Sequence, residues 1–180
     1  GDTVLVHGAT GGVGTACVQF ARSSGMNVLG TGGTERGRRM VKQQGAAAVF
    51  DHTRDGHMED VLEEIGGEGV DVVLEMLSNV NLNSDLEILA YGGRVIVIGS
   101  RGAVEIDPRR TMMRDADIRG MAVYLASPRD QEQIHSGIAL GLKNGWLDPV
   151  IDDELPLEEA PRAHREVMEG GACGKLVLIP

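Results

Sequence analysis

The start of the chain, residues 1–24, constrains the fold more than any other segment. An apolar run, Val4–His7, leads directly into a turn with glycines at positions 8, 11, 12 and 14. A segment with helical periodicity follows over 13–24, and it places Val13, Cys17, Phe20 and Ala21 on one expected buried face. Ala9, Gly11 and Gly14 occupy the three glycine positions of the G-x-G-x-x-G pattern, which joins a strand to a helix. The sequence therefore predicts a strand, a tight turn and a helix.

Short apolar runs alternate with helix-period segments through the rest of the chain. We expect further strands over 28–30, 47–50, 70–75, 94–98 and 118–124, and further helices over 35–44, 58–65, 82–90 and 128–143. The strands are continuously apolar, which is typical of parallel strands that are covered on both faces. The alternation predicts an α/β fold, a doubly wound parallel six-stranded sheet with helices on both faces.

The end of the chain departs from this alternation. A short strand at Val150–Ile151, a helix over 157–168 and a strand over 175–179 form a strand-helix-strand tail. We place a domain boundary near Asp148, giving a nucleotide-binding domain over 1–148 and a separate segment over 149–180. The chain has no initiator methionine and begins almost directly in a strand. We therefore expect it to be part of a longer protein, with sequence missing upstream.

The net charge and the cysteine content limit which binding partners and which cellular compartment the sequence favours. The 180 residues carry a formal net charge of −10, so a polyanion such as DNA or RNA is repelled on average. The two cysteines, Cys17 and Cys173, have no metal-ligand spacing and fit a reducing, cytoplasmic compartment. No apolar run is long enough to span a membrane.

The glycine turn carries the clearest binding signal. Gly11 has no side chain, so a pyrophosphate can approach the backbone, and Gly14 allows the helix to pack closely on the strand. The N–H groups of Gly12, Val13 and Gly14 then face the anion, which the helix dipole also attracts. The turn therefore predicts a dinucleotide site; the competing interpretation is a purely structural glycine-rich turn.

The tip of the second expected strand distinguishes between the two nicotinamide cofactors. An NAD site usually has an acidic residue there, but this tip reads Gly30-Thr31-Gly32-Gly33-Thr34. Glu35 lies in the first turn of a helix that Thr34 caps, so it is not expected to bind ribose. Arginines at 36, 38 and 39 can accommodate a 2′-phosphate. We predict NADPH as the cofactor.

Other strand ends are expected to line the same crevice. Asn79 and Asn81 are candidates for ribose or nicotinamide, and His52 is either an exposed loop residue or a neighbour of the adenine. Arg101 is equally open to a surface or a functional role, and Met121–Val123 can offer backbone groups to the nicotinamide amide. His7 is expected to point inward behind the turn. No catalytic constellation or metal-ligand spacing is evident.

Several runs resemble one family. They are His7–Gly14, Leu29–Glu35, Glu75–Asn81 and Gly92–Gly102, and the likeness continues through Gly145–Ile151 to Gly174–Lys175. These runs are similar to the zeta-crystallin type of NADPH:quinone oxidoreductase, in the zinc-free branch of the medium-chain dehydrogenase/reductase superfamily. The resemblance implies an oxidoreductase whose Rossmann domain is inserted into a GroES-like catalytic domain. Residues 149–180 would then be the returning part of that catalytic domain.

The resemblance also implies the site and the activity. The family's cofactor contacts carry over to a set of positions at strand ends, with Gly14 completing the turn: Thr10, Gly11, Gly12, Val13, Gly33, His52, Asn81, Ile98, Gly99, Ser100, Arg101, Met121, Ala122 and Val123. The longer protein would pass hydride or single electrons from NADPH to quinones, and we expect this chain alone to have little turnover. An NADPH-dependent enone or enoyl reductase is the alternative within the superfamily.

Partners follow from the same resemblance. Family members pair through an edge strand, so we expect a homo-oligomer that uses the 118–124 region. Crystallin relatives suggest a non-catalytic alternative, and some are implicated in RNA binding, which the charge of −10 opposes.

Overall fold

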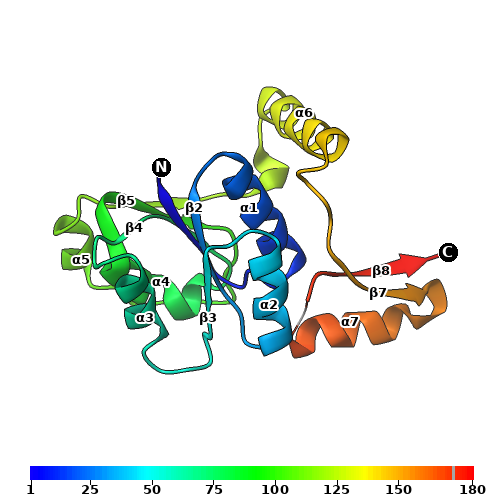
Figure 1. Cartoon of the computed structure of the whole chain (residues 1–180), viewed down its shortest axis with the longest axis horizontal. Coiled ribbons are helices and arrows are strands. Elements are labelled where there is room, and N and C mark those ends of the chain that lie inside the picture. Colours follow the sequence, from blue (N-terminus) through cyan, green and yellow to red (C-terminus); the bar gives the residue numbers. More distant parts are fainter. Residues whose placement is uncertain (172) are drawn as a thin grey trace.

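A computed structural model describes residues 1–171 and 173–180, and it shows an α/β sheet domain followed by a small tail (Figure 1). The sheet strands are β1 (Thr3–Val6), β2 (Asn27–Thr31), β3 (Ala48–Phe50), β4 (Val70–Glu75), β5 (Leu89–Val97) and β6 (Asp117–Gly120). The helices between them are α1 (Gly12–Ser23), α2 (Glu35–Gln43), α3 (His57–Glu64), α4 (Ser78–Ile88) and α5 (Pro108–Met112). After β6 come a 3₁₀ turn (Val123–Leu125) and α6 (Pro128–Asn144).

The six strands are parallel and lie in the order β3-β2-β1-β4-β5-β6, which confirms the predicted doubly wound sheet. Strand β1 lies near the centre of the sheet. Strands β2 and β3 follow on one side of it, and β4, β5 and β6 lie on the other. Adjacent loops therefore diverge at the carboxyl ends of β1 and β4. Ligands of doubly wound sheets bind at such a switch point.

Two apolar clusters, one on each face, hold the sheet. Leu5 of β1 packs with Val61 of α3 and Leu86 of α4, whereas Val4 and Val6 pack with residues of α1 and α2. Successive strand residues point to opposite faces, so one strand supplies both clusters. Helices on both faces are thus confirmed.

The structure corrects some element boundaries. The sixth strand ends at Gly120 rather than Tyr124, because its ladder with β5 stops there and the chain turns into the Val123–Leu125 3₁₀ turn. Helix α4 begins at Ser78, four positions before the expected start. The fifth strand begins at Leu89, inside the expected end of the preceding helix. Helix α5 was not predicted, although Asp107 caps it and Pro108 occupies its first turn.

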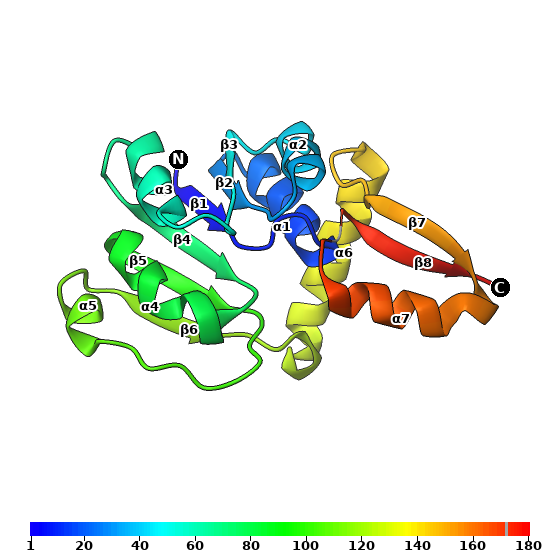
Figure 2. The same cartoon turned by 90° about the horizontal axis from the view of Figure 1, so that it is seen from below.

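The tail consists of β7 (Ile151–Pro156), a 3₁₀ turn (Leu157–Glu159), α7 (Ala160–Glu169) and β8 (Lys175–Ile179), with β7 and β8 pairing in parallel. Figure 2 shows it on the side of the molecule where α1 and α6 lie. The side chain of Gln19 in α1 holds the segment before the tail: Nε2 donates to the Asp148 carbonyl at 2.7 Å, and Oε1 accepts from the Asp148 N–H at 2.9 Å. The boundary near Asp148 and the origin of the tail stay predictions.

Strand β6 is the outer strand of the sheet, and its four residues are exposed. Ile118 within this strand, and Tyr124 and Leu125 after it, are exposed apolar side chains. Such an edge needs protection from unwanted pairing, and the expected oligomer through this region stays a prediction. Within the part of the chain that the structure describes, no helix has the length and apolar character to cross a membrane.

Candidate functional site

The glycine turn joins β1 to α1 in a tight, well-anchored path. Gly8 has a left-handed φ of +55°, and its N–H donates to the Thr31 hydroxyl at 3.1 Å. The N–H of Ala9 donates to the Thr31 carbonyl at 2.9 Å, so β2 anchors the turn. A Cβ at Gly14 would lie 2.4 Å from the Gly8 carbonyl oxygen, so only glycine permits this approach of helix and turn.

The N-terminus of α1 presents unpaired donors. Among the hydrogen bonds of the described residues, none uses the N–H of Val13 or Gly14 as donor, and the parallel bridge between Gly11 and Gly174 turns the N–H of Gly12 toward the Gly174 carbonyl. No side chain caps this end, and no acidic residue lies in the first turn. Val13, expected on the buried face, is instead 55% exposed, because the helix turns that position toward solvent. Free N–H groups and the helix dipole together make an anion-binding end.

A cleft of about 470 Å³ lies between this end of α1 and the tail. Gly11 and Gly12 line one side, and Asp152, Glu166 and Lys175 are among the residues of the other. The tail is fixed there because the Gly174 N–H donates to the Thr10 carbonyl at 2.8 Å. The aliphatic part of Lys175 crosses Gly12 so closely that a Cβ at Gly12 would lie 1.9 Å from Cδ. The glycine motif gives no sign of Lys175, which is remote in sequence.

The predicted site residues gather at one edge of the sheet. They lie just beyond the carboxyl ends of the six strands, in the β1–α1 turn, after β2 and β3, in the first turn of α4, and after β5 and β6. Of these positions only Gly14 is buried; the others are partly or fully exposed. Asn79 is used internally, since its Oδ1 accepts from the Arg101 N–H at 2.8 Å. The arrangement suits an extended ligand along the sheet edge.

The three arginines near the tip of β2 all have carboxylate partners. Arg36 pairs with Asp152 of the tail at 2.6 Å, and Arg39 pairs with Glu35 one turn away in α2. Arg38 pairs with Asp51 at 2.9 Å and also donates to the Gly32 carbonyl at 3.0 Å.

Two hydrogen bonds from Thr53, with a smaller contribution from the Arg38 charge, hold the pKa of Asp51 below its usual range. The sequence showed the arginines but not these partners, because Asp152 and Asp51 are distant from them along the chain.

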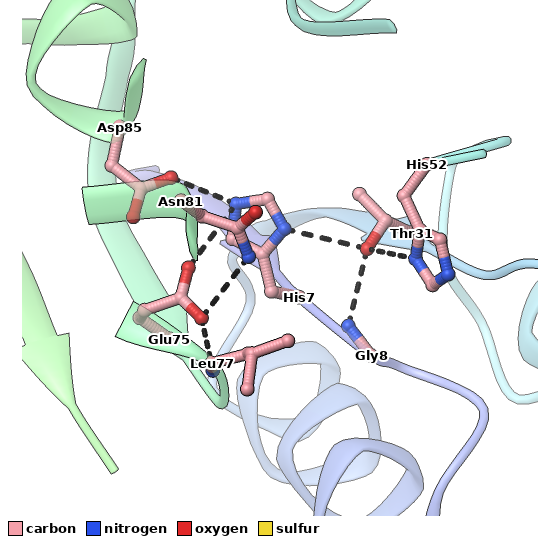
Figure 3. Close-up of polar contacts among 8 residues, drawn as sticks. All are labelled: His7, Gly8, Thr31, His52, Glu75, Leu77, Asn81 and Asp85. Carbon is pink, nitrogen blue, oxygen red and sulfur yellow. Dashed lines mark hydrogen bonds and ion pairs between the residues drawn. The ribbon is translucent and has the colours of Figure 1, made fainter. Parts of the chain in front are cut away.

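A buried polar cluster lies beneath the turn (Figure 3). The Nε2 atom of His7 is 2.9 Å from Oδ1 of Asp85 and 3.7 Å from Oε2 of Glu75. His7 is 2% exposed and both acids are 0% exposed. Burial raises the pKa of each carboxyl to about 7 and lowers that of His7. The inward position of His7 was predicted, but its two acidic partners were not.

The cluster touches both sides of the candidate site (Figure 3). On one side, Oε1 of Glu75 accepts from the Leu77 N–H and from the Asn81 amide at 3.3 Å. On the other, Nδ1 of His7 is 3.4 Å from the Thr31 hydroxyl, which is 3.3 Å from Nδ1 of His52. One hydrogen-bond network thus joins the buried cluster to Asn81 and His52, two of the predicted cofactor-binding residues.

Comparison with known proteins decides the family. The sequence model of a family described as zinc-binding dehydrogenase matches residues 12–140. The chain belongs to this family. This dehydrogenase-family chain is 46% identical over 180 residues to the quinone oxidoreductase of Sus scrofa, covering 99% of the chain and 55% of that protein. It thus spans about half the length of the curated relatives it matches, and the predicted resemblance to zeta-crystallin-type quinone oxidoreductases is confirmed.

Comparison with solved structures supports the same family assignment. The quinone oxidoreductase of Thermus thermophilus, also solved with NADPH, matches with a TM-score of 0.88 and 30% identity over 100% of the chain and 58% of that structure. The CurK enoyl reductase matches with a TM-score of 0.87 and 26% identity over 99% of the chain and 54% of that structure.

The family description includes zinc, but the residues of this chain do not suit a catalytic zinc. Among the described residues, His7, Glu75 and Asp85 form the one group with ligand-like spacing. It is buried under the turn, and catalytic zinc needs an open position for water or substrate. No chemistry through zinc is therefore assigned to these residues.

Proposed function

We propose that this chain is the NADPH-binding portion of an oxidoreductase that reduces quinones. The open N-terminus of α1 carries the proposal, since the free N–H groups of Val13 and Gly14 lie beside the side-chain-free backbone of Gly11. There the pyrophosphate would bind. The adenosine would extend toward Gly33 and His52, and the nicotinamide toward Asn81, the 98–101 stretch and the 121–123 stretch. Bound NADPH would supply the hydride, and this chain would orient it.

The preference for NADPH over NADH rests on the tip of β2. Among the described residues, the atoms nearest to a Cβ at Gly32 or Gly33 belong to Thr10, Arg38, His52 and Thr53, and none of them is a carboxylate oxygen. The arginines of α2 lie next to this loop. Arg36 and Arg39 are mostly exposed, so a phosphate can compete for them with their carboxylates. The Thermus thermophilus relative was solved with NADPH, which supports the same choice.

Affinity for the two cofactors tests this proposal. We expect the chain to bind NADPH at least about 10-fold more tightly than NADH, because a charged hydrogen bond contributes about 1.5–3 kcal/mol. Titration of nucleotide fluorescence at about 0.15 M salt, where surface charges are screened as in the cell, measures both dissociation constants. Equal affinities, or tighter binding of NADH, would refute the 2′-phosphate argument.

The activity belongs to the longer protein in this proposal. We expect the 180-residue chain alone to show little quinone-dependent NADPH oxidation, because the substrate-binding residues would come from the catalytic domain. Enoyl reduction is the second candidate, favoured by the likeness to CurK. A panel of quinones, enones and enoyl thioesters, assayed with the longer protein and with this chain, separates the two. Turnover by this chain near that of the longer protein would contradict the assignment of roles.

A further inference from the structure

The buried cluster holds one proton between its two carboxyl groups. Oε2 of Glu75 and Oδ2 of Asp85 are both buried without a hydrogen-bond partner. Two unpaired buried acceptors are costly, and a single proton between them satisfies both. With that proton between Oε2 and Oδ2, Oδ1 of Asp85 carries no proton. Oδ1 of Asp85 can therefore only accept a hydrogen bond.

Oδ1 of Asp85 determines the tautomer of His7. Burial lowers the pKa of His7, so its ring is neutral and has one N–H. The 2.9 Å contact between Nε2 and the proton-free Oδ1 of Asp85 requires that the proton lie on Nε2. Nδ1 of His7 is then a hydrogen-bond acceptor.

The Thr31 hydroxyl links the tautomer of His7 to that of His52. Its hydroxyl has one proton, which must be donated to Nδ1 of His7 at 3.4 Å. The Thr31 oxygen already accepts from Gly8, whose N–H can only donate, and it lies 3.3 Å from Nδ1 of His52. The His52 contact is satisfied only if Nδ1 of His52 is the donor. Nε2 of His52 is then left without a proton.

The unprotonated nitrogen faces the candidate site. A Cβ at Gly33 would lie 3.0 Å from Nε2 of His52, so this atom borders the β2–α2 loop where the adenosine is proposed to bind. Burial lowers the pKa of His52, so its ring is neutral at physiological pH. The other charged or titratable groups acting on this ring are His7, His57, Asp51 and Arg38.

We propose that Thr31 and His7 are positioning residues that fix the tautomer of His52, so that Nε2 of His52 accepts a hydrogen bond from the bound dinucleotide. The donor is a ribose hydroxyl or the adenine amino group, not a phosphate oxygen, which has no proton to give. The inference rests on the proposed function for the ligand, but the tautomer itself is a property of the free chain.

Nitrogen NMR of the free chain tests the tautomer directly. In the ¹⁵N-labelled protein at a pH of about 7.5, above the ordinary pKa of histidine, we expect His52 to carry its proton on Nδ1 and His7 to carry its proton on Nε2. Thr31→Val removes the hydroxyl but keeps the shape, so it should shift His52 toward the Nε2–H form. Thr31→Ser keeps the hydroxyl and should preserve the wild-type pattern. An Nε2–H form of His52 in the wild type, or identical spectra for Thr31→Val, overturns the proposal.

NADPH binding by the same variants tests the consequence. We expect Thr31→Val to weaken NADPH binding about 10-fold and Thr31→Ser to remain within about twofold of the wild type. Deamino-NADPH, in which hypoxanthine replaces adenine, distinguishes the donors. If the adenine amine is the donor, the effect of Thr31→Val disappears with this analogue. If the effect persists, it comes from a ribose hydroxyl when His52→Ala removes it, and from the lost Gly8 hydrogen bond, against the proposal, when His52→Ala leaves it unchanged.

Two further outcomes are decisive. If the wild type shows the expected tautomers but does not bind NADPH, the proposed function fails and the tautomer assignment stands. The purified chain could instead retain one equivalent of zinc or manganese that Asp85→Asn loses. That result would mean that a metal ion, not a proton, lies between the two carboxyl groups, and it would overturn the proposal.

Discussion

Substituting Gly11 by valine is expected to lower the affinity for NADPH by at least about 100-fold while leaving the fold intact, a loss of about 2.7 kcal/mol of binding free energy. Gly11 has an ordinary φ of −79°, so a side chain imposes no backbone strain. A Cβ there would meet a single atom, the Gly8 carbonyl oxygen at 3.7 Å. The added isopropyl group would instead occupy the space in front of the free N–H groups, where the pyrophosphate is proposed to bind.

The same turn shows why Gly11, and not Gly14, suits this experiment. A Cβ at Gly14 would lie within 3 Å of the backbone of Gly8 and Ala9, so any substitution there disturbs the packing of α1 on β1. Gly137 of α6 supplies the control, because a Cβ there meets no heavy atom within 4 Å. Gly137→Val should bind NADPH as the wild type does. Calorimetric titration measures affinity and thermal unfolding measures stability; normal binding by a folded Gly11→Val protein would mean that the phosphate site lies elsewhere.

The fold could be predicted from the sequence because each local signal pointed to the same architecture. The run 70–75 is rich in valine and leucine and free of glycine, and the structure has β4 over that same range. Thr34 was expected to cap a helix, and its hydroxyl accepts from the Gly37 N–H at 3.1 Å. These features depend on neighbours in sequence, which a linear pattern contains.

The missed features depend on neighbours in space. Glu75 reads as the end of a strand and Asp85 as a polar residue within a helix. They meet His7 only because β4 lies beside β1 and α4 packs on β4. Likewise, Asp152 reaches Arg36 from 116 positions away, and Lys175 reaches Gly12 from the end of the chain. Periodicity identifies which face of an element is buried, but it does not identify which polar groups share that burial.

The buried acid Glu75 also predicts how stability depends on pH. Its pKa in the folded chain is about 7, raised from 4.5 mainly by burial. Because the folded form binds the proton more tightly than the unfolded form, the stabilising contribution is complete below about pH 4.5. It is lost progressively as the pH rises through about 7. With about 1.4 kcal/mol for each pKa unit, the full loss is of the order of 3 kcal/mol.

Glu75→Gln should remove this dependence. The glutamine amide can donate to Asp85 as the protonated acid does, and its oxygen can still accept from Leu77 and Asn81. Relative to the wild type, we therefore expect the variant to gain about 2–3 kcal/mol of unfolding free energy at about pH 8 and almost none at about pH 4.5. Urea unfolding at the two pH values measures the difference. The exposed Glu64 of α3 provides the control, since Glu64→Gln should change stability equally at both. The lowered pKa of His7 has the opposite effect, because it reduces stability as the pH falls. Since His7 is present in both proteins, this effect largely cancels when they are compared. A gain of the same size at both pH values would show that Glu75 holds no proton in the folded chain.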